Sequence, residues 1–195
     1  MYEILIRIEK TLLYMLTKLI KFFLEIIIKT NRQKVKDSFE RVLPVGDYFS
    51  DRWEKARFYG FGEGTSVYDN VLIFGDVNVG KNCWIGPNCI LDGSGGKLSI
   101  GDNCAVSAGV HIYTHDTVQK VLSAGIAKVS KASVSIGNDC FIGPNSVISK
   151  GSIIGEKCVI GALTFVNGKS VPSFSRIYAN REKIFINDKS KDLFI

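Results

Sequence analysis

The amino-acid sequence predicts a mainly β protein, a parallel β-helix preceded by an amphipathic α-helix. After position 60, aliphatic residues recur every six residues, and a glycine often follows them directly. Residues 1–30 are strongly apolar, yet their charges return every three or four residues, as on one side of a helix. The predicted parts are an N-terminal helix and connector over 1–57, a β-helix over 58–171 with a loop at 118–132, and a C-terminal tail over 172–195.

The charged stripe of the N-terminal helix leaves a wide apolar face. A secretory signal peptide or a membrane-spanning helix needs an apolar run with few or no charges, and Lys18, Lys21 and Glu25 interrupt this one. Two interpretations remain open. The helix packs against its own domain or its copies in an oligomer, or it lies in a membrane interface with help from its basic residues. Those basic residues are Arg7, Lys10, Lys18, Lys21 and Lys29.

Charge and cysteine content narrow the class of protein. The formal net charge is +6, but residues 58–171 carry eight basic and eight acidic side chains, so the basic excess lies at the two ends. No dense basic stripe with interleaved aromatic residues is present, which argues against nucleic-acid binding. The five cysteines do not have the spacing of metal ligands, and we interpret them as core residues. Free cysteines suit a reducing cytoplasm, so we expect a cytoplasmic protein. If the N-terminal helix binds a membrane, the protein would be peripheral at its inner face.

The six-residue period has a direct physical interpretation. Residues two apart on a strand face the same side, so each aliphatic residue and the small residue two positions earlier both face inward. Asparagine or aspartate often stands three positions after the aliphatic residue, where it tolerates a left-handed turn. Three short strands then close one coil of eighteen residues, and stacked coils bury a continuous core. Cys140 and Cys158 are one coil apart, which predicts that they stack inside the core.

Two breaks interrupt the repeat. The first, Asp92–Ser99, adds three residues and predicts a small bulge at a corner of the coil. The second, Val118–Ala132, predicts a loop that projects from the coil, and such insertions often carry function. His115 precedes this loop at the corner position that asparagine holds in other repeats, so we interpret it as a catalytic base. His111 precedes an inward-facing aliphatic residue, which predicts that its side chain points outward.

The pattern over residues 61–171 resembles the hexapeptide-repeat acyltransferase family, most clearly at Ile85–Asn88, Ile100–Cys104 and Ile142–Asn145. The resemblance implies a left-handed β-helix that forms a homotrimer, with active sites between neighbouring subunits. The segment at His115 is similar to sugar O-acetyltransferases of this family, in which an aliphatic residue precedes a His-Asp or His-x-His cluster. In the second form, the second histidine would fall at Thr117.

This resemblance implies transfer of an acetyl group from acetyl-CoA to a sugar hydroxyl of a cell-surface polysaccharide or its precursor, with no metal. Alternatives are N-acylation of a nucleotide-linked amino sugar and a non-catalytic assembly module. His115 would be the base, and Asp116 or Asp92 would orient it. The acceptor would contact Asp92, Tyr113 and His111. The usual C-terminal Gly-x-Pro-Ala segment is absent, and the candidates for the CoA phosphates are Lys150, Lys157, Lys169, Arg176 and Arg181.

Overall fold

The computed structural model describes residues 2–178, with side chains from residue 6 onward, and its contacts form two compact units, Met1–Phe49 and Ser50–Ile195. Arg181 and most of the predicted C-terminal tail lie outside the described residues. The helices are α1 (Tyr2–Phe39), η1 (Val45–Tyr48, a 3-10 helix), α2 (Arg52–Phe58) and α3 (Val118–Leu122). The strands are β1 (Ser66–Val67), β2 (Leu72–Val79), β3 (Trp84–Ile85), β4 (Ile90–Ile100), β5 (Ala105–Val106), β6 (His111–Tyr113), β7 (His115–Asp116), β8 (Ser130–Lys131), β9 (Val134–Ile136), β10 (Phe141–Ile142), β11 (Val147–Ile148), β12 (Ile153–Ile154), β13 (Val159–Ile160), β14 (Phe165–Val166), β15 (Ser170–Val171) and β16 (Arg176–Ile177).

The first unit is a single long helix with a short return. α1 has 38 residues and extends beyond the strongly apolar residues 1–30 into the predicted connector, because no glycine or proline interrupts it before Pro44. η1 then folds back along the C-terminal part of α1. Asn31 Nδ2 donates to the carbonyl oxygen of Tyr48 at 3.0 Å, and the Leu43 N–H donates to the Tyr48 hydroxyl at 2.9 Å. These bonds order the segment that follows the helix.

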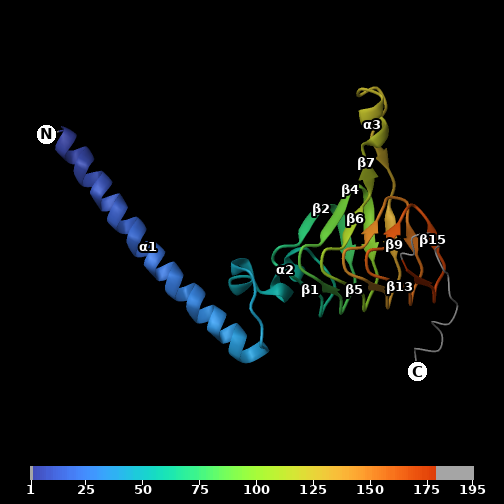
Figure 1. The fold of residues 1–195 in the computed structure, drawn as a ribbon, viewed down its shortest axis with the longest axis horizontal. Helices are drawn as coiled ribbons and strands as arrows, with labels where there is room; N and C mark the ends of the chain where they lie inside the picture. Colours follow the sequence, from blue (N-terminus) through green and yellow to red (C-terminus); the bar gives the residue numbers. More distant parts are fainter. Residues whose placement is uncertain (1, 179–195) are drawn as a thin grey trace. The chain divides into compact units, whose positions relative to one another are not determined.

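The second unit contains the predicted parallel β-helix, and its strands stack in three faces (Figure 1). One face holds β1, β3, β5, β10, β13 and β16 in that order. The long strands β2 and β4 continue from the second face into the third. β6, β11 and β14 extend the second face from the first half of β4, and β9, β12 and β15 extend the third from its second half. All pairings within these faces are parallel.

The core follows the predicted six-residue pattern. Ile85, Val106, Ile142 and Ile160 are fully buried on successive coils of the first face. Cys140 and Cys158 are both buried, and the strands that follow them are paired, which confirms that they stack. The predicted asparagine and aspartate turns are confirmed as well, because their φ angles are between 54° and 59°. These turns are at Asn82, Asn88, Asn103, Asp139 and Asn145.

The limits of the β-helix differ from the predicted ones. At its start, α2 belongs to the second unit and packs on the first coil, where Lys55 Nζ donates to the carbonyl oxygen of Tyr68 at 3.0 Å. Asp51 caps this helix by accepting from two backbone N–H groups at 2.9 Å each. At the other end, β16 continues the first face to Ile177, beyond the predicted limit at residue 171. Residues 172–177 contain no glycine or asparagine, so the six-residue pattern is weak in this last repeat.

The first break in the repeat is a bulge, as predicted, and it lies within one long strand. β4 includes Asp92–Ser99 and pairs with β2, but Gly93 pairs with Gly75 and Leu98 with Val77, so three extra residues of β4 bulge between these pairs. The glycines of the insertion make this possible, because a Cβ at Gly93 would collide with the backbone of Asp76. The extra residues therefore lie along the edge of the coil where the second break begins.

Candidate active site

A projecting segment begins at the end of β6 (Figure 1). β7 and β8 form an antiparallel ribbon, in which His115 is opposite Lys131 and Asp116 is opposite Ser130, and α3 lies between the two strands. This corrects the position inferred for His115. The asparagines at the corners have positive φ angles, whereas His115 does not and lies in an extended strand. The chain leaves the coil here instead of turning its corner.

Thr114 joins the projecting segment to the β4 insertion. Its side chain is fully buried, and its hydroxyl donates to the carbonyl oxygen of Asp92 at 2.8 Å and accepts from the Gly95 N–H at 2.9 Å. Its own carbonyl oxygen accepts from the Ala132 N–H at 2.9 Å. A Cβ at Gly95 would lie 2.5 Å from the Cβ of His115, so only glycine fits there. The insertion and the ribbon are therefore fixed against one another.

The imidazole of His115 faces a carboxylate from the insertion. His115 Nδ1 lies 3.4 Å from Asp92 Oδ2 and 3.4 Å from the Ser94 hydroxyl. Asp92 Oδ1 accepts from the Ser94 N–H at 2.9 Å and from the Ser94 hydroxyl at 2.5 Å. The Asp92 side chain is 9% exposed and that of His115 is 30% exposed. A carboxylate held at Nδ1 favours the tautomer that carries its proton there, which leaves Nε2 free to accept a proton.

Asp116 does not share this arrangement. Its Oδ2 pairs with Lys150 Nζ at 2.9 Å, and its Oδ1 accepts from the Val118 N–H at 3.1 Å. The Lys150 ammonium is the main cause that lowers the pKa of the Asp116 carboxyl below its ordinary value. Of the two carboxylates that could orient His115, the structure places Asp92 at the imidazole. Lys150, a candidate for CoA phosphates, is occupied by an ion pair.

The two candidate acceptor contacts on β6 lie beside Asp92. Tyr113 is opposite Asp92 in the β4–β6 ladder, and its hydroxyl is 3.3 Å from Nδ1 of His111. Burial, followed by the charge of Asp92, raises the pKa of Tyr113, so this phenol stays protonated as a hydrogen-bond donor. His111 is aligned with Ile90 and Val147, next to the fully buried Ile112, and faces the exterior of the coil. Asp92, Tyr113 and His111 therefore lie on the second face, beside the start of the ribbon that contains His115.

The basic candidates do not gather in one place. Lys169 precedes β15, Lys157 precedes β13 on another face, and Arg176 lies on β16. The Lys157 ammonium lies 5.7 Å from the centroid of the Phe174 ring. Arg176 Nε is buried and makes no hydrogen bond to the described residues. Geometry alone thus selects no CoA phosphate site from these side chains.

Ser94, Gly95 and Thr114 were not identified as site residues from the sequence. The only signal in the sequence was the glycine-rich insertion at Asp92–Ser99, and the fold was needed to place this insertion against residue 115. A cluster of three or more histidine, cysteine or acidic side chains that could hold a metal ion is absent from residues 2–178.

Comparisons with known proteins agree with this architecture. Residues 76–114 match the family described as "Hexapeptide repeat of succinyl-transferase", and residues 133–168 match "Bacterial transferase hexapeptide (six repeats)". The carnitine operon protein CaiE of Proteus sp. is 36% identical over 104 residues, which cover 51% of this chain and 52% of that protein. The chain thus spans about half the length of the curated relatives it matches.

Two solved structures share the fold at low sequence identity. AntD, an N-acyltransferase from Bacillus cereus in complex with dTDP and 3-hydroxybutyryl-CoA, has a TM-score of 0.58 and is 20% identical, with 68% of this chain and 74% of that chain covered. A maltose O-acetyltransferase from Clostridium difficile 630 has a TM-score of 0.50 and is 21% identical, with 85% and 84% covered. The second unit is a parallel β-helix, and its repeats match models of hexapeptide repeats. Residues 76–114 and 133–168 thus match hexapeptide-repeat models, in agreement with the resemblance seen in the sequence.

Proposed function

We propose that this chain is an acyl-CoA-dependent acyltransferase that moves an acetyl group from acetyl-CoA to a sugar hydroxyl, with His115 as its general base. The pairing of His115 Nδ1 with Asp92 Oδ2 at 3.4 Å carries this proposal. This contact favours the imidazole tautomer with its proton on Nδ1, which makes Nε2 the proton acceptor at the base of the projecting segment. The hexapeptide-repeat family and the CoA complexes of proteins with the same fold support the choice of donor.

The reaction needs one proton acceptor that later becomes a proton donor. Nε2 of His115 takes the proton of the acceptor hydroxyl while the hydroxyl oxygen forms a bond to the carbonyl carbon of the thioester. The carbonyl oxygen becomes negatively charged, and nearby backbone N–H groups or the Tyr113 hydroxyl would stabilise it. The C–S bond then breaks, the carbonyl re-forms, and the imidazolium returns its proton to the CoA sulfur. Asp92 stabilises the imidazolium while it exists.

A screen of acceptors tests this function. The full-length protein is incubated with acetyl-CoA and a panel of sugars, sugar phosphates and amino-sugar nucleotides, and free thiol is measured. Amino sugars belong in the panel because AntD, which shares the fold, is an N-acyltransferase. We expect thiol release with a hydroxyl acceptor and its acetyl ester as product. An amide product from an amino sugar would favour the alternative, and no release with any acceptor would favour a non-catalytic assembly module.

We infer that the protein is a homotrimer. Large apolar side chains project from the second face, where Leu72, Phe74 and Phe165 are 51%, 47% and 56% exposed. A row of this kind on a sheet is typical of a surface that a partner covers. The expected result is three times the monomer mass in multi-angle light scattering of the purified protein. A stable monomer, in buffer and in mild detergent, would contradict the assembly.

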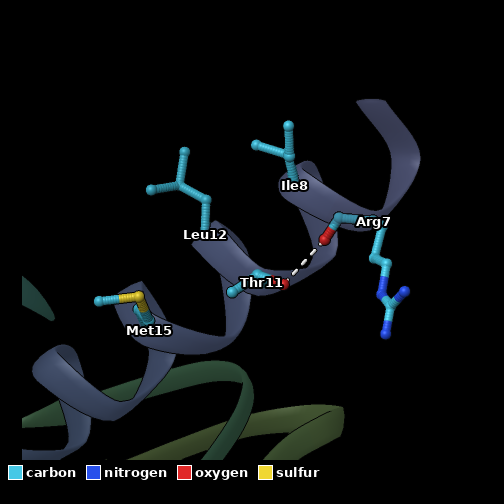
Figure 2. A pocket seen from close by; sticks show the side chains of 5 residues that line it. All are labelled: Arg7, Ile8, Thr11, Leu12 and Met15. Carbon is cyan, nitrogen blue, oxygen red and sulfur yellow. Dashed lines mark hydrogen bonds between the residues drawn. The ribbon is translucent and has the colours of Figure 1, made fainter. Parts of the chain in front are cut away.

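We also propose that α1 binds the surface of an anionic membrane. No helix among residues 2–178 is long and apolar enough to cross a bilayer. Ile8, Leu12 and Met15 lie on one side of α1 along a shallow hollow, while Arg7 points away from them (Figure 2). Leu19 and Phe22 continue this exposed side by the same spacing. An apolar side with basic residues beside it is typical of a helix that lies in the headgroup region.

Vesicle flotation tests this contact. The protein should float with vesicles of phosphatidylglycerol and phosphatidylcholine, and less with phosphatidylcholine alone. Leu12→Gln combined with Leu19→Gln should reduce the bound fraction at least about tenfold, because each leucine loses apolar burial of about 1.5–3 kcal/mol. Thr17→Gln, on the charged side, is the control and should change little. If the double variant alters the oligomeric mass and leaves flotation unchanged, α1 packs between subunits instead.

A further inference from the structure

The projecting segment contains an open hollow that the proposed mechanism does not use. Its volume is about 530 Å³. The residues that line it are Lys120, Gly125, Ile126, Ala127, Lys128, Val129 and Lys131. Three of the seven are lysines, and the others are small or apolar. Positive charge over a wall of low polarity concentrates the electric field and attracts anions.

The positive charge of this hollow has no counter-charge in its own segment. From Thr117 to Asn138 the sequence contains three lysines and no aspartate or glutamate. The carboxylate just before the segment, Asp116, already pairs with Lys150. The ion pairs found among residues 2–178 involve none of the three lysines. An anion bound in the hollow would offset their mutual repulsion, and a phosphate group can accept hydrogen bonds from several lysines at once.

The shape of the hollow is fixed by its own hydrogen bonds. The carbonyl oxygen of Lys120 accepts from the Gly125 N–H at 2.7 Å and from the Ser123 hydroxyl at 3.2 Å. The same hydroxyl accepts from the Ala127 N–H at 2.8 Å. These bonds close a tight turn in which Gly125 has a φ of +93°. The cations are therefore carried on an ordered turn, which reduces the entropy lost when they bind a ligand.

The hollow is also adjacent to the proposed base. Lys131 is the direct cross-strand partner of His115 in the antiparallel ribbon, so their side chains project from the same side of it. We propose that Lys120, Lys128 and Lys131 bind a phosphate group of the acceptor, which would make the acceptor a sugar phosphate or a sugar nucleotide. In acyl-CoA, the long pantetheine arm separates the phosphates from the reacting thioester. A phosphate beside the base therefore fits the acceptor, and this inference rests on the proposed function.

Pyrophosphate is the probe for this site, and isothermal titration calorimetry of the full-length protein is the measurement. Lys128→Gln combined with Lys131→Gln should raise the dissociation constant of pyrophosphate at least about tenfold. Each substitution removes a charge-assisted hydrogen bond from an ammonium group to a phosphate oxygen, and such bonds are strong. Lys34→Gln combined with Lys81→Gln changes the net charge equally at exposed lysines elsewhere, and it should change the constant less than about twofold. Equal affinities for the two double variants would overturn the proposal.

A second titration separates the two sources of phosphate. With the protein saturated with CoA, pyrophosphate should still bind, and it should still depend on Lys128 and Lys131. If CoA abolishes pyrophosphate binding, or if the lysine variant weakens CoA binding tenfold, the hollow serves the acyl donor and the proposal is wrong. Pyrophosphate binding requires no turnover. An inactive protein that binds the probe through these lysines would therefore contradict the proposed function and leave the anion site standing.

Discussion

Replacing His115 with asparagine lowers kcat by about 10²–10⁴-fold, the contribution that general-base catalysis typically makes. The fold should persist, because asparagine keeps the Cβ that packs against Gly95 and the imidazole is only partly buried. The KM for acetyl-CoA should change little, since the lost interaction forms with the reacting proton. The measurement is steady-state release of CoA thiol with the acceptor found in the screen, together with the thermal midpoint of each protein.

His111 supplies the matched control, because the chain has two histidines and both are partly exposed on neighbouring strands. His111→Asn removes a side chain that contacts the Tyr113 hydroxyl and faces the exterior. His111→Asn should lower kcat far less than His115→Asn does. If His111→Asn abolishes turnover and His115→Asn does not, the base is on the neighbouring strand. If both variants remain fully active, acyl transfer by a histidine base is excluded for this chain.

The sequence was sufficient for the coil because the same physical requirement repeats in every strand. Each turn needs a residue that tolerates a left-handed backbone, and each strand needs an inward aliphatic side chain. Asn88 and Asn145 meet the first requirement at equivalent corners, and Ile85 and Ile142 meet the second. A pattern that recurs many times in one phase tolerates local exceptions. The predicted fold class and the buried, stacked cysteines followed from this redundancy.

The candidate site had no such redundancy, and its details could not be derived from spacing. His115 occupies the sequence position of a corner asparagine, yet its backbone is extended because the chain leaves the coil there. Asp92 is 23 positions away, and only the parallel pairing of β4 with β6 places it beside the ribbon. Asp116 is adjacent in sequence, but neighbouring residues on a strand point to opposite sides. Sequence proximity therefore favoured the carboxylate that the structure pairs with Lys150.

Converting Asp92 to asparagine should lower kcat by about 10²–10⁴-fold, although Asp92 touches no reacting atom. The amide oxygen of asparagine can still accept from the Ser94 N–H and hydroxyl, so the insertion should keep its conformation. Its NH₂ group would then face Nδ1 of His115 and donate to it. That contact moves the imidazole proton to Nε2, where it blocks the base. The carboxylate that stabilises the imidazolium is lost as well.

The tautomer itself can be observed, which separates this role from a structural one. With two histidines in the chain, nitrogen-15 NMR of labelled imidazoles gives a simple spectrum that His115→Asn assigns. The Nδ1–H form is expected for neutral His115 in the original protein, and the Nε2–H form is expected in Asp92→Asn. Asp116→Asn is the control. It breaks an exposed ion pair with Lys150 and should leave the tautomer unchanged and kcat within about threefold. A large loss of kcat in Asp116→Asn together with an unaffected Asp92→Asn would show that Asp116, and not Asp92, orients the base.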